Sequence, residues 1–299
     1  MPPTSTPDQD PTSSAHVHPA PSGTCDAHFH VFGPTTRYPM ASDSLHGPVN
    51  APVERYLDIT RSLGIERFVV VQPSGYGTDN ACTLDALREL GTDRARAVVV
   101  IDDQSPPGDE VFRQWHALGA RSFRVLTHAR EPDQALVEPM AAKIRRLERI
   151  AVDLGWHLDL LFPGWLTELM LPTLEELSVD FSVAHLGWFP VDAADSKGFK
   201  GLLRLASSGE RRCWPKLTGF YRLPGAEGLT AASELVDAAI EAAPDRVLWG
   251  TDHPHVFFKE GTFAAPQMLA ALRTMVSDEG QQRKVLVENP AALYGFGPV

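Results

Sequence analysis

Apolar runs with β-strand character alternate with amphipathic stretches along most of this chain, and this alternation restricts the folds open to it. The candidate strands are residues 24–29, 67–72, 95–101, 120–125, 157–162, 180–185, 213–217 and 246–250. The stretches with helical spacing of apolar residues are 53–63, 79–90, 109–118, 135–154, 165–178, 198–208, 229–243 and 266–277. Strands that alternate with helices form parallel sheets, so the pattern indicates the α/β class.

Eight successive β-then-α units in about 270 residues match a (β/α)8 TIM barrel in number and in length. Glycines such as Gly64, Gly91, Gly119 and Gly155 mark several of the helix ends. A doubly wound open sheet is the alternative, but no Gly-x-Gly-x-x-Gly sequence follows any candidate strand. The sequence therefore predicts a TIM barrel, whose active site should lie at the C-terminal ends of the strands.

The start of the chain differs in composition from the rest. Residues 1–22 are rich in Pro, Ser and Thr and contain almost no large apolar residues, so we expect a disordered tail. Residues 23–299 are expected to form a single (β/α)8 domain. His16 and His18 lie in the tail, where no strand holds them, and we interpret them as surface residues.

Charge and cysteine content narrow the possible partners. The net charge of −11 argues against nucleic acid and against an anionic membrane surface, and no apolar run is long enough to span a bilayer. A small anionic substrate remains possible if the pocket itself is basic. The chain has no signal-peptide pattern, and its three cysteines are scattered, which predicts reduced thiols and a cytoplasmic location. The oligomeric state cannot be read from the sequence.

Three histidines and one aspartate stand at strand ends. His28 and His30 end the first strand, His185 ends the sixth, and Asp252 follows the eighth. Because side chains alternate along a strand, the two histidines of an H-x-H sequence emerge on the same face. Three imidazoles and a carboxylate that meet at one mouth can hold a metal, or can activate water and polarise a carbonyl without one. We predict a joint catalytic role for these four residues.

Basic side chains also fall at the predicted mouth. Arg124 lies in an apolar strand and needs an anionic partner, which is either a structural carboxylate or a substrate carboxylate. Arg130 is either a solvated loop residue or a substrate contact, and Arg222, after the seventh strand, is interpreted as substrate-binding. Ser74 follows the second strand. Lys216 is as consistent with a structural ion pair to a neighbouring carboxylate as with a substrate contact, so we leave it out of the predicted site.

Six motifs occur along the chain in this order: Asp26-Ala-His-Phe-His-Val-Phe-Gly33, Val71-Gln-Pro-Ser-Gly-Tyr-Gly-Thr-Asp-Asn80, Ala184-His-Leu-Gly187, Lys216-Leu-Thr-Gly-Phe-Tyr-Arg222, Trp249-Gly-Thr-Asp-His-Pro254 and Glu288-Asn-Pro-Ala-Ala-Leu-Tyr294. With this set of motifs the sequence resembles the amidohydrolase superfamily, and within it the branch that contains 2-pyrone-4,6-dicarboxylate hydrolase. The resemblance runs from about Cys25 to Phe296.

The resemblance implies a lactonase that opens a ring ester on a small carboxylated acid, in the catabolism of aromatic compounds. It implies that Asp252 is the general base that takes a proton from water. His28, His30 and His185 would then fix that water and polarise the lactone carbonyl. A dicarboxylate substrate would be bound by three basic side chains and one hydroxyl, namely Arg124, Arg130, Arg222 and Ser74.

Two departures from the branch bear on the substrate. The family has a tyrosine in the loop after the first strand, where this chain has His46, and another near the end of the fifth strand, where it has Leu160-Leu161-Phe162. Both tyrosines contact substrate in the family. We therefore expect His46 in the substrate pocket, and we keep sugar-acid lactones and sulfonated muconolactones as alternative substrates.

The resemblance also bears on whether the protein binds a metal. The usual single-metal site of the superfamily takes a further ligand from a middle strand, but here the fourth strand ends with Arg124 and the fifth with Leu160-Leu161-Phe162. We therefore predict catalysis without a metal. The alternative is one zinc ion held by His28, His30, His185 and Asp252. Two rival functions remain: a zinc-dependent decarboxylase of the same barrel family, and a non-enzymatic acid-binding barrel.

Overall fold

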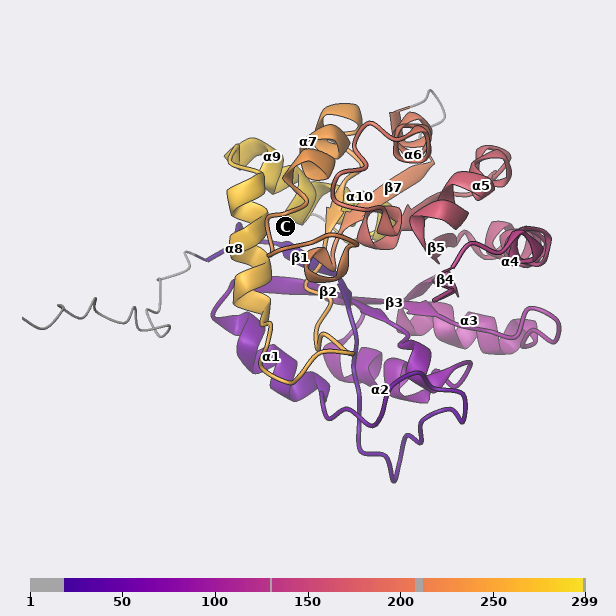
Figure 1. Cartoon of the computed structure of the whole chain (residues 1–299). Coiled ribbons are helices and arrows are strands. Elements are labelled where there is room, and N and C mark those ends of the chain that lie inside the picture. The colour runs from indigo at the N-terminus through magenta and orange to yellow at the C-terminus, as the bar shows by residue number, and fades with distance from the viewer. Residues whose placement is uncertain (1–18, 130, 208–211, 298–299) are drawn as a thin grey trace, which may run out of the picture.

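The computed structural model describes residues 19–129, 131–207 and 212–297. Its strands are β1 (Thr24–Phe29), β2 (Ile65–Val71), β3 (Ala95–Val99), β4 (Ala120–Leu126), β5 (His157–Leu161), β6 (Phe181–Val183), β7 (Cys213–Leu217) and β8 (Leu248–Trp249). Its α-helices are α1 (Val53–Arg61), α2 (Ala81–Leu90), α3 (Asp109–Leu118), α4 (Val137–Leu154), α5 (Gly164–Glu175), α6 (Lys197–Ser207), α7 (Ser233–Ala242), α8 (Ala265–Met275), α9 (Glu279–Arg283) and α10 (Asn289–Tyr294). Figure 1 shows the helices as a ring around the strands.

The strands lie in the order β1 to β8, and each pairs in parallel with the next. Backbone bonds cross the remaining gap between the first and last strands. The Asp252 N–H donates to the His28 carbonyl and the His30 N–H donates to the His253 carbonyl, both at 2.8 Å. The (β/α)8 TIM barrel expected from the alternation is thereby confirmed.

Two apolar clusters hold the barrel together. The larger one fills the space between the strands and the surrounding helices, and the smaller one, which includes Val69, Val98 and Trp214, fills the barrel interior. The strands are therefore buried on both faces, which explains continuous apolar runs such as Phe68–Val71. Burial of these side chains supplies most of the driving force for folding.

The C-terminal segment closes the barrel at the N-terminal ends of the strands. The Arg96 Nε group donates to the Tyr294 carbonyl at 2.9 Å, and an Arg67 amino group donates to the Gly297 carbonyl at 2.6 Å. Tyr294 is almost completely buried, and Phe296 packs under both guanidinium groups. The short helices α9 and α10 that carry this segment are not among the predicted helices.

Two boundaries differ from the expectations. The sequence predicts the sixth strand over 180–185, but it ends at Val183, because His185, Leu186 and Gly187 adopt positive φ angles in a tight turn. The sequence also predicts a tail that extends to residue 22, but the Ala20 N–H donates to the Leu63 carbonyl at 2.8 Å and its side chain is buried. The packed part therefore begins by residue 19, whereas residues 1–18, with His16 and His18, lie outside the described residues.

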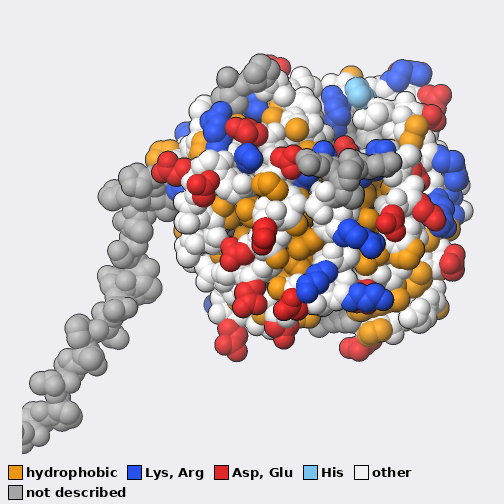
Figure 2. Space-filling view, turned by 90° about the horizontal axis from the view of Figure 1, so that it is seen from above, with side chains coloured by type: hydrophobic (Ala, Val, Ile, Leu, Met, Phe, Trp, Pro, Cys, Tyr) orange, Lys and Arg blue, Asp and Glu red, His pale blue; other side chains and the backbone are white. Residues whose placement is uncertain are grey.

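The surface carries charges of both signs. Figure 2 shows acidic and basic side chains interspersed over one face, with hydrophobic side chains between them. The net charge of −11 is therefore not gathered on that face into a single acidic patch. Among the helices that the structure describes, none is both long and apolar enough to cross a membrane.

Candidate active site

A buried carboxylate fixes the seam between β1 and β8. Asp26 accepts hydrogen bonds from the backbone N–H groups of His28 and Thr251, both at 3.0 Å, and from the hydroxyls of Thr251 and Tyr56. The two strands approach so closely that a Cβ on Gly250 would lie 2.5 Å from the His28 nitrogen. Only glycine fits there without a shift of the backbone, so Gly250 sets the distance between the histidine strand and Asp252.

Asp252 lies at the centre of the histidine cluster. Its Oδ1 atom is 3.6 Å from His28 Nε2 and 3.5 Å from His30 Nε2, and its Oδ2 atom is 3.9 Å from His185 Nε2. All four side chains are almost completely buried. The φ angle of Asp252 is 58°, in the left-handed region that non-glycine residues rarely occupy. The structure thus brings together the four residues that the sequence predicts to be catalytic.

Hydrogen bonds at the far side of two rings set their orientation. His30 Nδ1 donates to the Val71 carbonyl at 2.7 Å, which leaves Nε2 as the acceptor of the neutral ring. His185 Nδ1 lies 2.7 Å from the Thr218 hydroxyl, and a Cβ on Gly219 would lie 2.5 Å from that same nitrogen. The small residue at 219, with its φ of 60°, therefore leaves room for the imidazole.

Burial keeps the histidines neutral and the aspartate is ionised. Burial lowers the pKa of His28 well below its usual value, and it also lowers the pKa of His30 and brings that of His185 to about 3. Burial works to raise the pKa of Asp252, but His185, His30 and Arg222 outweigh it and hold that pKa well below its usual range. At neutral pH the site is a carboxylate surrounded by neutral imidazoles.

Tyr221 contacts the cluster, although it is not among the residues predicted from the sequence. Its hydroxyl donates to Asp252 Oδ2 at 2.5 Å, and its ring is buried. Burial, together with the negative charge of Asp252, raises the pKa of Tyr221 well above its usual value, so the hydroxyl stays protonated as a donor. The signal is present in the motif Lys216-Leu-Thr-Gly-Phe-Tyr-Arg222, where Tyr221 precedes the predicted arginine.

Arg222 lies at the edge of the same cluster. Its Nη1 atom is 3.8 Å from Asp252 Oδ2, and the side chain is only 12% exposed. Its guanidinium packs against the rings of Trp188 and Phe257. Arg222 also lines a cavity of about 310 Å³, whose other lining residues are Ala129, Pro163, Trp188 and Pro224. The arginine therefore connects the carboxylate to a space large enough for a small acid.

Arg124 and Lys216 meet a buried carboxylate beneath the mouth. Lys216 Nζ lies 2.5 Å from Asp159 Oδ2, and Arg124 Nε lies 3.8 Å from Asp159 Oδ1. Arg124 also donates to the Gln72 carbonyl at 2.5 Å. Lys216 therefore pairs with a neighbouring carboxylate, as the sequence allowed, and the same carboxylate faces Arg124. Asp159 is not among the residues predicted from the sequence, although an aspartate inside an apolar strand is itself a signal of a buried ion pair.

The remaining residues predicted to contact substrate are Ser74, His46 and Arg130. Ser74 begins a short 3-10 turn after β2, Ser74–Tyr76. The His46 ring borders this turn, because a Cβ on Gly75 would lie 3.0 Å from its Nε2 atom. The structure therefore brings His46 beside the turn that contains Ser74. Arg130 lies outside the described residues.

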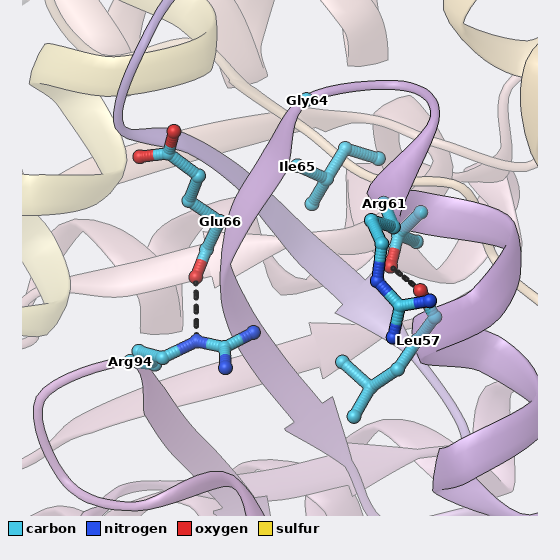
Figure 3. Close-up of a pocket in the computed structure, with 7 residues that line it drawn as sticks. Leu57, Arg61, Gly64, Ile65, Glu66 and Arg94 are labelled. Carbon is cyan, nitrogen blue, oxygen red and sulfur yellow. Dashed lines mark hydrogen bonds between the residues drawn. The ribbon is translucent and has the colours of Figure 1, made fainter.

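A second cavity of about 310 Å³ lies at the opposite end of the barrel. Figure 3 shows its lining at the start of β2 and the end of α1, with Arg94 donating to the backbone carbonyl of Glu66 at 3.3 Å. Its Arg61 pairs with Asp58 on the same helix. Among the predicted site residues that the structure describes, none lines this cavity. We therefore assign the chemistry to the mouth, where the strand ends converge.

The donor set at the mouth fits a divalent metal. One nitrogen of His28, one of His30 and a carboxylate oxygen of Asp252 lie within 4.8 Å of one another. Neither ring nitrogen of His28 has a hydrogen-bond partner among the described residues, and Nε2 of His30 faces a carboxylate with its lone pair. The middle strands β4 and β5 contribute Arg124 and Asp159, which face each other, and Asp159 pairs with Lys216.

Comparison with known proteins identifies the family of the chain. A model of the amidohydrolase family matches residues 15–296. A 4-sulfomuconolactone hydrolase from Hydrogenophaga intermedia is 32% identical and covers 94% of this chain and 92% of its own. A 2-pyrone-4,6-dicarboxylate hydrolase from Comamonas testosteroni is 30% identical, over 92% of this chain and 90% of its own. An apo structure from Agrobacterium tumefaciens, 24% identical, shares the fold with a TM-score of 0.80 over 94% of this chain and 99% of its own. The chain belongs to the amidohydrolase family.

Proposed function

We propose that this hydrolase opens the lactone ring of a small carboxylated acid, with Asp252 as the base that activates water. One observation carries the proposal. The Asp252 carboxylate lies 3.5–3.9 Å from a ring nitrogen of each of three buried imidazoles, and its neighbours hold its pKa well below the usual range. Such a carboxylate accepts a proton from water, and a neutral imidazole that keeps an N–H can donate it to a carbonyl oxygen.

The reaction can be written with its protons in balance. Water loses a proton to Asp252 while its oxygen attacks the lactone carbonyl, and the developing oxyanion is stabilised by histidine N–H donors from His28 and His185. The ring C–O bond then breaks, and the leaving oxygen takes up the proton from Asp252. The Tyr221 hydroxyl holds the carboxylate in place during both steps.

The proposed substrate is an anionic lactone such as 2-pyrone-4,6-dicarboxylate. Arg222 lies beside the base and lines a cavity, which is where an acidic substituent of the ring would bind. An arginine fork binds a carboxylate with two hydrogen bonds and so fixes the ester for attack. We propose further contacts from Arg124, Arg130, Ser74 and His46. A sulfonated muconolactone is the second candidate, because a relative with that named activity is 32% identical.

We propose that the reaction needs no metal, because a guanidinium already lies 3.8 Å from the carboxylate that a divalent ion would share. If a zinc ion is bound, His28, His30 and Asp252, with His185, would hold it, and it would lower the pKa of a bound water. We also propose a cytoplasmic location, since Cys25, Cys82 and Cys213 are free and buried.

An ultraviolet assay in excess chelator tests these points together. Purified protein is mixed with 2-pyrone-4,6-dicarboxylate and, in parallel, with 4-sulfomuconolactone, and ring opening is followed by absorbance. Rapid turnover that disappears in Asp252→Asn supports the metal-free lactonase. Turnover that returns only with added zinc refutes the metal-free reaction, and release of carbon dioxide indicates the decarboxylase instead. Binding without turnover of either lactone, unaffected by Asp252→Asn, favours a non-enzymatic acid-binding barrel.

A further inference from the structure

The ring of Phe257 lies where several loops of the barrel mouth meet. Its centroid is 5.4 Å from that of His46, in the loop after β1, and 6.0 Å from that of His128, in the loop after β4. The guanidinium carbon of Arg222, after β7, lies 5.5 Å from the same ring centroid. One side chain from the loop after β8 therefore contacts the loops of three other strands.

Arg222 is held by aromatic rings as well as by charge. Its guanidinium carbon is also 5.2 Å from the Trp188 ring, and the indole N–H of Trp188 donates to the Arg222 carbonyl at 3.2 Å. Aromatic rings attract a guanidinium through their π-electrons and leave its N–H edge for an anion. Phe257 and Trp188 thereby restrict the directions in which Arg222 can present its N–H groups.

Phe257 itself is in an unfavourable state for a hydrophobic residue. It is 46% exposed, and its φ angle of 74° lies in the left-handed region, as do those of Asp252 and His255 nearby. Bulky residues keep such a conformation only where their surroundings enforce it, and these conformations gather at functional sites.

We propose that Phe257 is a positioning residue, which orients Arg222 toward an acidic group and so sets the preference for carboxylated over neutral lactones. The inference rests on the proposed function, because it deepens the role given there to Arg222. In the described part of the chain, the side chains around the Asp252 carboxylate are three imidazoles, one tyrosine and Arg222. Phe257 acts through the last of these, so its loss should weaken substrate binding and leave the maximal rate nearly unchanged.

The test compares Phe257→Leu, which removes the ring but keeps an apolar side chain, with Phe257→Tyr, which keeps the ring. Binding of pyridine-2,4-dicarboxylate, an unreactive planar diacid, is measured by calorimetry. KM and kcat are measured for 2-pyrone-4,6-dicarboxylate and for the neutral lactone dihydrocoumarin. Val152→Ala, on the exposed face of α4, is the matched surface control.

Phe257→Leu should weaken diacid binding and raise KM for the charged lactone about fivefold, the size of one lost cation–π contact. Its kcat should stay within about twofold, and kcat/KM for dihydrocoumarin should not change. Phe257→Tyr and Val152→Ala should both behave like the wild-type protein.

Three results would overturn the inference: unchanged diacid affinity in Phe257→Leu, an equal loss with the neutral lactone, or a wild-type protein that does not bind the diacid. The same measurements distinguish failure of this inference from failure of the proposed function. If the wild-type protein hydrolyses no lactone but Phe257→Leu still loses diacid affinity, the acid-positioning role stands and the lactonase assignment does not.

Discussion

Asp252 has a strained backbone conformation, and its carboxylate lies close to several polar side chains of the site. Its φ of 58° turns the side chain back toward β1, and Tyr221, Arg222 and the histidines surround it. Strain of this kind costs about 1–3 kcal/mol and persists where the surrounding contacts fix the conformation. The position of the carboxylate is thus fixed by residues from several strands and loops of the barrel mouth.

Replacing Asp252 by asparagine should remove the base and keep the shape of the site. We expect kcat to fall about 10³-fold, in the range of general-base catalysis, while affinity for a dicarboxylate stays within about tenfold. Steady-state kinetics and calorimetry on the same preparation measure both quantities. A variant that retains near-normal kcat would show that another group takes the proton.

Replacing Tyr221 by phenylalanine removes one charge-assisted hydrogen bond from the base. The carboxylate then loses an orienting donor, and we expect kcat to fall about tenfold, which corresponds to about 1.4 kcal/mol. Tyr38→Phe is the matched control, because the Tyr38 hydroxyl bonds Asp85 on α2 at 2.7 Å rather than Asp252. Equal rates in Tyr221→Phe and Tyr38→Phe would contradict a role for Tyr221 in the reaction.

At the scale of elements, the closure between β1 and β8 decides whether the site exists. The hydrogen bonds of Asp26 and the two backbone bonds across the seam bring the histidine strand against the aspartate strand. Gly250 permits this approach. The active site is therefore a property of this one contact between strands that lie more than 200 residues apart in the chain.

A Gly250→Ala substitution should push the two strands apart. We expect it to destabilise the protein by about 1–3 kcal/mol or more, because the added Cβ meets backbone at 2.5 Å, and to lower activity at the same time. Urea unfolding measures the first effect. Gly47→Ala, where an added Cβ would meet nothing within 4 Å, is the control and should unfold within about 0.5 kcal/mol of the wild-type protein.

At the scale of the whole molecule, buried titratable groups make stability depend on pH. Burial brings the pKa of His157, His185 and His253 to about 3, below the ~6.5 of an exposed imidazole. Between these values the unfolded chain binds protons that the folded chain does not, so stability is lost as pH falls below about 6.5. Asp26 acts in the opposite direction, because burial raises its pKa to about 6. The loss of stability from the three histidines is larger than the gain from the one aspartate.

We therefore expect the free energy of unfolding to fall between pH 7.5 and 5.5. His157 lies under the barrel against Tyr294, away from the mouth, and can be changed without touching the catalytic cluster. His157→Leu should lose about 1.4 kcal/mol less than the wild-type protein over this interval. Urea titrations at both pH values measure the difference. Identical pH dependence in the two proteins would mean that His157 does not stay neutral in the fold.

The sequence by itself determined the barrel and the position of its chemistry. Local periodicity marks strands and helices, and parallel strands place their C-terminal ends at one mouth, so the order of residues is enough to group His28, His30, His185 and Asp252. Only the tertiary structure decided which groups touch. Tyr221 on Asp252, Asp159 between Arg124 and Lys216, and Phe257 on Arg222 are contacts between different strands and loops. Periodicity carries no information about such pairs, because their distances depend on how the closed barrel packs.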